Sequence, residues 1–384
     1  MKTLKYFLLT MILFKLATFG LTYFGSTVGS LLSALFFSCL LVYYFLSTKS
    51  NLPLVFIVLG LSYFLISGLN YKGELRDYYM DFIKYFIFIL GVGHLTKDTS
   101  ARELGLFAFI GAMSVLINAV VFSTHYGRYG GFYINPNEAG LVCLVAFSLT
   151  FYFKNVVLKL FLQLLIVTAG IMTLSRYFIL MLFFVNIIAV LSNRKNSISL
   201  VAGSIGIVFV LTVSSLFNLN TTRFSAFHSI FGSEEIETQT ITKGSRSETW
   251  ALYTDIILDN PITGIGYRAL HGNQTQYSII NVNVGVHNAY LMAIGESGII
   301  TFLLMILVYI SLVLRSIKHL KYNLEYICIA AVLATHLLVS HNYFDNYFVL
   351  FISIWLYQRV KNKPDSSFNG NGEKETANIN HITF

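Results

Sequence analysis

The chain has 384 residues, of which 55% are hydrophobic and only 11% are charged. A soluble domain carries roughly 25% charged residues, so this composition excludes a soluble globular protein and predicts a polytopic membrane protein. Its spans should be helices, because a helix satisfies its own backbone hydrogen bonds in lipid. The net charge of +8 comes from basic residues spread over many short loops, which excludes a nucleic-acid-binding patch.

Apolar windows of about 17–25 residues are long enough to cross a bilayer, and the chain contains about twelve of them. We therefore expect an all-α fold with about nine spans over residues 1–217, a large outer loop carrying short helices over 218–293, and about three spans over 294–360. The polar tail over 361–384 is rich in Asn, Gly and Ser, which predicts disorder. The predicted spans are residues 4–23, 27–46, 52–69, 78–95, 104–123, 139–153, 156–174, 177–192, 198–217, 294–315, 325–341 and 345–360.

The distribution of lysine and arginine predicts the orientation of these spans. If the N-terminus is cytoplasmic, sixteen basic residues fall on the cytoplasmic side and eight on the outer side. The short cytoplasmic loops of membrane proteins carry the excess of basic residues. We therefore expect both termini in the cytoplasm and the large loop outside.

Four arginines on the expected outer face predict an anion-binding site. Arg128 precedes one span, Arg176 lies at the tight connection between two spans, and Arg223 and Arg246 lie in the large loop. A single arginine at the membrane edge is as often a residue that only contacts lipid headgroups. Four on a face otherwise poor in positive charge favour a phosphate ligand, since guanidinium binds phosphate bidentately and keeps its charge. At that depth the expected anion is a lipid-linked diphosphate.

The large loop contains a predicted helix. Residues 245–248 read Ser-Arg-Ser-Glu and fit the capping box, so a helix should run from Arg246 to about Leu258. We expect its apolar face to lie on the membrane surface, with an ordinary packed loop helix as the alternative. The residues on that face are Trp250, Tyr253 and Ile257.

His287 lies where the large loop returns to the membrane. An imidazole with its ordinary pKa near 6.5 suits a general base, although an isolated interfacial histidine more often only forms hydrogen bonds. If a helix runs on from His287, Glu296 lies nine residues later on the opposite side of the axis, so we expect a structural role for Glu296. His341 and Asp345 form a weaker second polar group near the last span.

No metal-binding motif is present in the sequence. The chain contains no Asp-x-Asp, no His-x-x-x-His and no cysteine cluster, and its three cysteines all lie in apolar runs. We therefore expect that neither a metal ion nor another cofactor takes part in the reaction.

Taken together, these motifs resemble the family of bacterial O-antigen ligases and O-antigen or exopolysaccharide polymerases. The specific part is residues 246–298, where Arg-x-x-x-Trp, Asn-Pro-x-x-Gly-x-Gly, His-Asn-x-Tyr and Gly-Glu-x-Gly occur in the family's order. The segments around Arg128 and Arg176 match weaker family motifs. The resemblance implies a membrane glycosyltransferase of the GT-C type in the bacterial inner membrane, with its active site on the outer face. Its implied donor is a glycan on undecaprenyl diphosphate, and it needs neither a metal nor a nucleotide sugar.

The resemblance also implies roles for individual residues. In the reaction, a sugar hydroxyl attacks the anomeric carbon of the donor and expels a lipid diphosphate, whose growing negative charge fixed arginines would stabilise. The catalytic residues should be His287 as the base, with Arg176 and Arg246 on the diphosphate. The expected substrate-binding residues are Arg128, Arg223 and Asn288, and the expected supporting residues are Glu296 and Trp250.

The acceptor stays open at this point, because no residue identifies it. We expect a polymerase that joins lipid-linked repeat units, with a glycan or lipid acceptor and a chain-length regulator as a candidate partner. A ligase that transfers glycan to the lipid A core is the alternative. A transporter that uses the outer arginines only for binding is a second alternative, although the spans carry no charge relay and no inverted repeat.

Overall fold

The structure is a computed structural model that describes residues 1–47, 52–122, 127–213, 246–272, 285–340 and 343–361. Every longer regular element in these ranges is an α-helix, so the predicted all-α fold is confirmed for this part of the chain. The helices are α1 (Lys2–Leu13), α2 (Leu16–Phe24), α3 (Ser26–Leu46), α4 (Leu54–Leu69), α5 (Leu75–Asp98), α6 (Ala101–Val121), α7 (Pro136–Leu149), α8 (Val156–Met172), α9 (Arg176–Ser192), α10 (Ile198–Val213), α13 (Arg246–Asp259), α14 (Ala289–Lys318), α15 (Leu324–His336) and α16 (Tyr347–Val360).

Each predicted span coincides with a helix or, in the first case, with a bent pair. Among the described residues, α3, α6 and α14 are long and apolar enough to cross a membrane, and the pair α1 and α2 is a fourth candidate. The helices α4, α8, α9, α15 and α16 are apolar but have only 10–17 residues. The membrane helices are therefore confirmed, whereas the count of twelve spans is not.

The first predicted span is wrong as a single helix. The axes of α1 and α2 differ by 60°, and the break falls at Lys15, whose backbone is left-handed with φ +50°. The Lys15 ammonium forms an ion pair of 2.7 Å with Glu138 in the first turn of α7. A lysine in the middle of an apolar run needs such a partner, and the chain bends where the lysine meets it.

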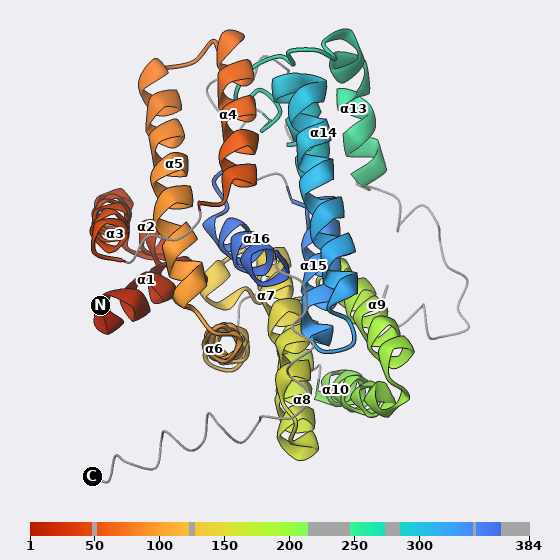
Figure 1. The fold of residues 1–384 in the computed structure, drawn as a ribbon. Coiled ribbons are helices and arrows are strands. Elements are labelled where there is room, and N and C mark those ends of the chain that lie inside the picture. Colours follow the sequence, from red (N-terminus) through yellow and green to blue (C-terminus); the bar gives the residue numbers. More distant parts are fainter. Residues whose placement is uncertain (48–51, 123–126, 214–245, 273–284, 341–342, 362–384) are drawn as a thin grey trace.

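The helices run in crossing directions. In Figure 1, α4, α5, α8 and α14 are seen from the side, whereas α6 is seen nearly end-on. Large side chains in the interior are mostly aromatic, including Tyr63 and Trp355, which are fully buried. Apolar side chains on α3 point outward instead, and Phe45 is 78% exposed. An exposed apolar face of this kind suits contact with lipid.

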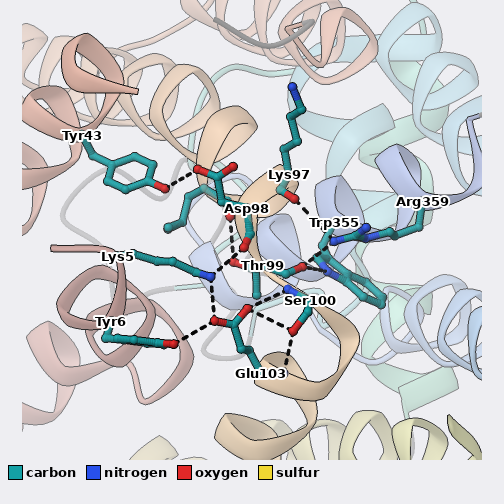
Figure 2. A network of polar contacts seen from close by, with 11 residues as sticks. Lys5, Tyr6, Tyr43, Lys97, Asp98, Thr99, Ser100, Glu103, Trp355 and Arg359 are labelled. Atoms are coloured by element: carbon teal, nitrogen blue, oxygen red, sulfur yellow. Dashed lines mark hydrogen bonds and ion pairs between the residues drawn. The ribbon is translucent and has the colours of Figure 1, made fainter. Parts of the chain in front are cut away.

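A polar junction joins both ends of the described chain at the turn between α5 and α6 (Figure 2). The Lys5 ammonium donates to the Asp98 carbonyl oxygen at 2.6 Å. The Thr99 carbonyl oxygen accepts from Arg359 at 2.6 Å and from the Trp355 indole at 2.9 Å. Carbonyl groups at a helix end lack partners within the helix, so these donors stabilise the turn. The start of α1 and the end of α16 therefore lie at one place, and the side of the membrane that they face stays a prediction.

Candidate active site

Arg128 and Arg176 both lie at the turn between α8 and α9. The Arg128 guanidinium donates to the Thr173 carbonyl oxygen at 3.2 Å and to Asn137 Oδ1 at 3.3 Å. Ser175 donates to the same Asn137 oxygen at 3.2 Å and is the N-cap of α9, whose first residue is Arg176. The Arg128 side chain is therefore fixed by the protein. Arg176 is exposed, and within the described ranges its guanidinium has no hydrogen-bond or ion-pair partner.

The C-terminal end of α15 joins the starts of α9 and α14. Three donors bind carbonyl oxygens in this part of α15 or just after it: the Tyr177 hydroxyl at 2.5 Å, the Tyr290 hydroxyl at 3.0 Å and the Ala289 amide at 2.7 Å. Arg176 directly precedes the first of these donors, and His287 lies two residues before the last. Two of the predicted catalytic residues, which are 111 positions apart in sequence, are therefore held at the same end of one helix.

His287 is not part of a helix. Its φ is +48°, a left-handed conformation that is uncommon for any residue with a side chain. Asn288 follows as the N-cap of α14, and its side-chain oxygen accepts from the backbone amides of Tyr290 and Leu291 at 3.0 and 3.2 Å. The condition that a helix runs on from His287 is therefore not met, since the helix begins two residues later. Because α14 begins only at Ala289, the helical spacing between His287 and Glu296 does not determine how they face each other.

Glu296 fastens the end of the large loop to the membrane helices. Its side chain is fully buried, and its two oxygens accept from the Tyr63 hydroxyl at 2.5 Å and from the Leu270 amide at 3.0 Å. A buried carboxylate without such partners would be strongly destabilising. Glu296 therefore connects α14 with α4 and with the segment 267–271, and its contacts are structural.

The two glycine-containing motifs, residues 260–266 and residues 295–298, are joined by backbone hydrogen bonds. The Ile265 amide donates to the Gly295 carbonyl oxygen at 2.8 Å, and the Ile299 amide donates to the Pro261 carbonyl oxygen at 2.8 Å. Gly298 interrupts α14 with φ +79°, and a Cβ atom there would lie 1.8 Å from the Ile262 carbonyl oxygen. Only glycine fits that approach, so these motifs position the end of the large loop against α14.

His271 is a neighbour of His287 that the sequence did not single out. The Val286 amide donates to the Leu270 carbonyl oxygen at 3.1 Å, so the two backbone segments run side by side, with His271 and His287 each one residue further on. Burial, followed by the charges of Arg268 and His287, lowers the pKa of His271 to about 4. His271 is therefore neutral at pH 7. Its only signal in the sequence was its place within the polar segment of the loop.

The helix α13 begins at Arg246 and ends at Asp259, as the capping box predicted. The prediction that its apolar face lies on the membrane surface is wrong, because Tyr253 and Ile257 on that face are buried inside the protein. A Cβ atom on Gly295 of α14 would lie 3.1 Å from Ile257, so α14 covers this face. Trp250 is half-buried against the same core.

Some predicted residues lie outside what the structure describes. Arg246 is placed as the first residue of α13, but its side chain lies outside the described part. The same holds for Ser245 of the capping box, for Arg223 and most of the large loop, for His341, and for the tail after Lys361. Among the predicted residues that the structure describes, Arg128 and Arg176 lie at the turn between α8 and α9, and the segments of Arg176 and His287 attach to the C-terminal end of α15.

Arg176 and His287 are thus held near the same end of α15, in a membrane protein whose described residues form an all-α fold. Residues 161–306 match the family model described as O-antigen ligase. This segment runs from α8 into α14 and includes Arg176 and His287. The match confirms the predicted relationship of the chain to the O-antigen ligase and polymerase family. A search of curated proteins gave no match.

Proposed function

We propose that this protein is a glycosyltransferase that polymerises oligosaccharide repeat units linked to undecaprenyl diphosphate into O-antigen or another surface polysaccharide. It acts on the outer face of the bacterial inner membrane, with both termini in the cytoplasm. The observation that carries the proposal is the attachment of both the Arg176 and the His287 segments to the end of α15. The family match over residues 161–306 supports the same class of enzyme.

The proposed reaction forms one glycosidic bond and breaks another. An acceptor hydroxyl oxygen attacks the anomeric carbon of the donor glycan, the bond to the lipid diphosphate breaks, and His287 takes the hydroxyl proton. Negative charge grows on the leaving diphosphate and requires fixed positive groups. Arg176 is exposed and available for the diphosphate, while Arg128 is already held by Thr173 and Asn137. Each charge-assisted hydrogen bond contributes about 1.5–3 kcal/mol.

Arg246 and Arg223 complete the proposed set of diphosphate contacts. Both belong to the large loop, and Arg246 begins the helix α13, which packs on α14. In this scheme the arginines stabilise the leaving group without a metal ion. Purified enzyme should therefore keep its turnover in EDTA, and activity that is lost in EDTA and restored by magnesium or manganese would contradict this part of the proposal.

The catalytic assignment is tested with purified variants in lipid nanodiscs. His287→Ala should retain binding of the lipid-linked donor and lose about 10²–10⁴ in single-turnover rate, the usual contribution of a positioned base. His381→Ala, in the C-terminal tail, is the matched control and should transfer glycan at the parent rate. A His287→Ala enzyme with the parent rate would remove the assignment of the base.

The acceptor decides between the candidate functions, and the same preparation tests it. Lipid-linked repeat units alone should yield products that are two or more units long. Transfer only when lipid A core is supplied would identify a ligase. Donor that is bound and moved across the bilayer without any joining of glycans would favour a transporter.

A further inference from the structure

Asn137, in the first turn of α7, connects Arg128 with the residue that precedes Arg176. Its Oδ1 atom accepts a hydrogen bond of 3.3 Å from the Arg128 guanidinium and one of 3.2 Å from the Ser175 hydroxyl. Ser175 is the N-cap of α9 and directly precedes Arg176. One amide oxygen therefore fixes the Arg128 side chain relative to the start of α9.

These two hydrogen bonds determine which way the Asn137 amide faces. A guanidinium group has only N–H donors, so the atom of Asn137 that faces Arg128 is the oxygen. The Nδ2 group, with its two N–H donors, therefore points away from Arg128. Within the part of the chain that the structure describes, Nδ2 has no hydrogen-bond partner, and the residue is only half-buried. The amide nitrogen can therefore donate to a ligand.

The backbone around Asn137 is held on both sides. Asn135 is the N-cap of α7, and its side-chain oxygen accepts from the Asn137 amide at 2.9 Å. One turn further along α7, a Cβ atom on Gly140 would lie 3.2 Å from the Ser175 side chain, so α7 packs closely on the turn between α8 and α9. The Asn137 side chain is therefore preorganised, which lowers the entropy cost of binding a ligand.

The charges around Asn137 favour an anion. Arg128 and Arg176 bring two positive charges to this place, and Lys15 brings a third. Glu138 is the acidic neighbour, but its carboxylate forms an ion pair of 2.7 Å with Lys15. Both α7 and α9 begin here, and the N-terminal end of a helix carries partial positive charge. An N–H donor in positive surroundings suits the oxygen atoms of a phosphate.

A diphosphate has more acceptor oxygens than one guanidinium can bind, so the remaining oxygens need further donors. Arg176 is exposed, and the Ser175 hydroxyl next to it contacts Asn137. Arg128 contacts the same Asn137 oxygen from the other side. An anion bound between the two arginines would therefore lie beside the Asn137 amide.

We propose that Asn137 is a further ligand of the donor diphosphate, with its Nδ2 group donating to a diphosphate oxygen while its Oδ1 atom holds Arg128 and Ser175. The identity of the anion rests on the proposed function, because the lipid diphosphate is the leaving group of that reaction. The binding of a prenyl diphosphate needs no turnover and can be measured alone. A directional N–H donor adds orientation to the charge that the arginines supply.

Asn137→Asp separates the two halves of the amide. Aspartate keeps the size of the side chain and an acceptor oxygen for Arg128 and Ser175, but replaces the N–H donor with a negatively charged oxygen. The thermal midpoint should therefore not fall, whereas the Kd for geranyl diphosphate should rise about tenfold or more. Isothermal titration calorimetry with the full chain in lipid nanodiscs measures this Kd. The proposal is overturned if the parent does not bind geranyl diphosphate or if Asn137→Asp binds it equally well.

Asn135→Asp is the matched control. It introduces the same negative charge two residues away, at an exposed position of the same helix start, and aspartate is as good an N-cap as asparagine. Because an exposed charge is screened by salt, its Kd for geranyl diphosphate should stay within about threefold of the parent value. Equal losses of affinity in the two variants would reflect charge alone and would overturn the direct contact.

A double-mutant cycle separates the direct contact from an effect through Arg128. In an Arg128→Gln background, Asn137→Asp should still raise the Kd for geranyl diphosphate about tenfold, because the lost donor acts on the ligand itself. If the effect of Asn137→Asp disappears in that background, Asn137 only positions Arg128, and the direct contact is overturned.

Transfer assays separate this proposal from the proposed function. In an active enzyme, Asn137→Asp should raise the KM for the donor and lower kcat, since the charge of the leaving group grows in the transition state, and leave the KM for the acceptor unchanged. A parent that binds geranyl diphosphate through Asn137 but never joins glycans would contradict the proposed function alone. Glycan transfer by a parent whose Asn137→Asp variant binds and transfers equally well would contradict the role of Asn137 alone.

Discussion

His271 Nε2 lies 3.7 Å from Glu296 Oε1, yet the two side chains do not form an ion pair at neutral pH. Burial, followed by the electrostatic influence of Arg268 and then of His287, lowers the pKa of His271 to about 4, so its imidazole is uncharged. Glu296 is instead satisfied by the Tyr63 hydroxyl and the Leu270 amide. The contact therefore holds a neutral imidazole beside the His287 segment of the proposed catalytic site.

The first prediction concerns stability at low pH. The pKa of His271 is below its unfolded value of about 6.5, so the unfolded chain takes up a proton first as the pH falls. This contribution to stability is present above about pH 6.5 and is lost as the pH falls toward 4. The thermal midpoint of the parent should fall over this range. His271→Asn removes the titrating group and should give a flatter profile, whereas equal slopes in the two proteins would contradict the lowered pKa.

A second prediction concerns Arg176. Arg176→Ala should weaken donor binding and lower single-turnover transfer as well, each by roughly 10–100-fold, because one charge-assisted contact contributes about 1.5–3 kcal/mol. Arg176→Lys keeps the charge but loses the bidentate geometry, so it should restore part of the loss. The exposed Arg102→Ala, near the α5–α6 turn, should match the parent in both assays. An Arg176→Ala protein with normal donor affinity would exclude the diphosphate contact.

A third prediction concerns the break in α14. Gly298→Ala places a Cβ atom 1.8 Å from the Ile262 carbonyl oxygen and forces alanine to φ +79°. Destabilisation by well over about 1 kcal/mol is expected at such a position, with a lower thermal midpoint and less protein in the membrane. Gly203→Ala on α10 meets no atom within 4 Å and is the control. Equal midpoints for the two variants would mean that the two glycine motifs are not locked together as described.

The fourth prediction concerns orientation. In a protein without native cysteines, Leu258→Cys on α13 should react with a membrane-impermeant maleimide in intact cells with a permeabilised outer membrane. Leu258 is 68% exposed, so accessibility does not limit the reaction. Arg102→Cys, at the junction of α5 and α6, should react only after lysis. The opposite pattern would reverse the topology and place the proposed active site in the cytoplasm.

The sequence by itself determined the class of protein, the family that it resembles and the approximate positions of its helices. Apolar windows identify helices because lipid leaves an isolated backbone segment few alternatives. The capping box similarly predicted where α13 begins, since a cap involves only residues within one turn. The motifs of the loop were recognisable for the same reason, as each is a local pattern of residue types.

Only the tertiary structure decided how these local patterns meet. Tyr63 and Glu296 are separated by 233 positions, yet one hydrogen bond joins them. The apolar face of α13 packs on α14. The sequence did not distinguish this packing from a helix on the membrane surface, because both require the same spacing of apolar residues. The position of His271 next to His287 is evident only from the backbone hydrogen bond between Val286 and Leu270. Such contacts depend on long-range chain geometry, which hydropathy and motif spacing do not contain.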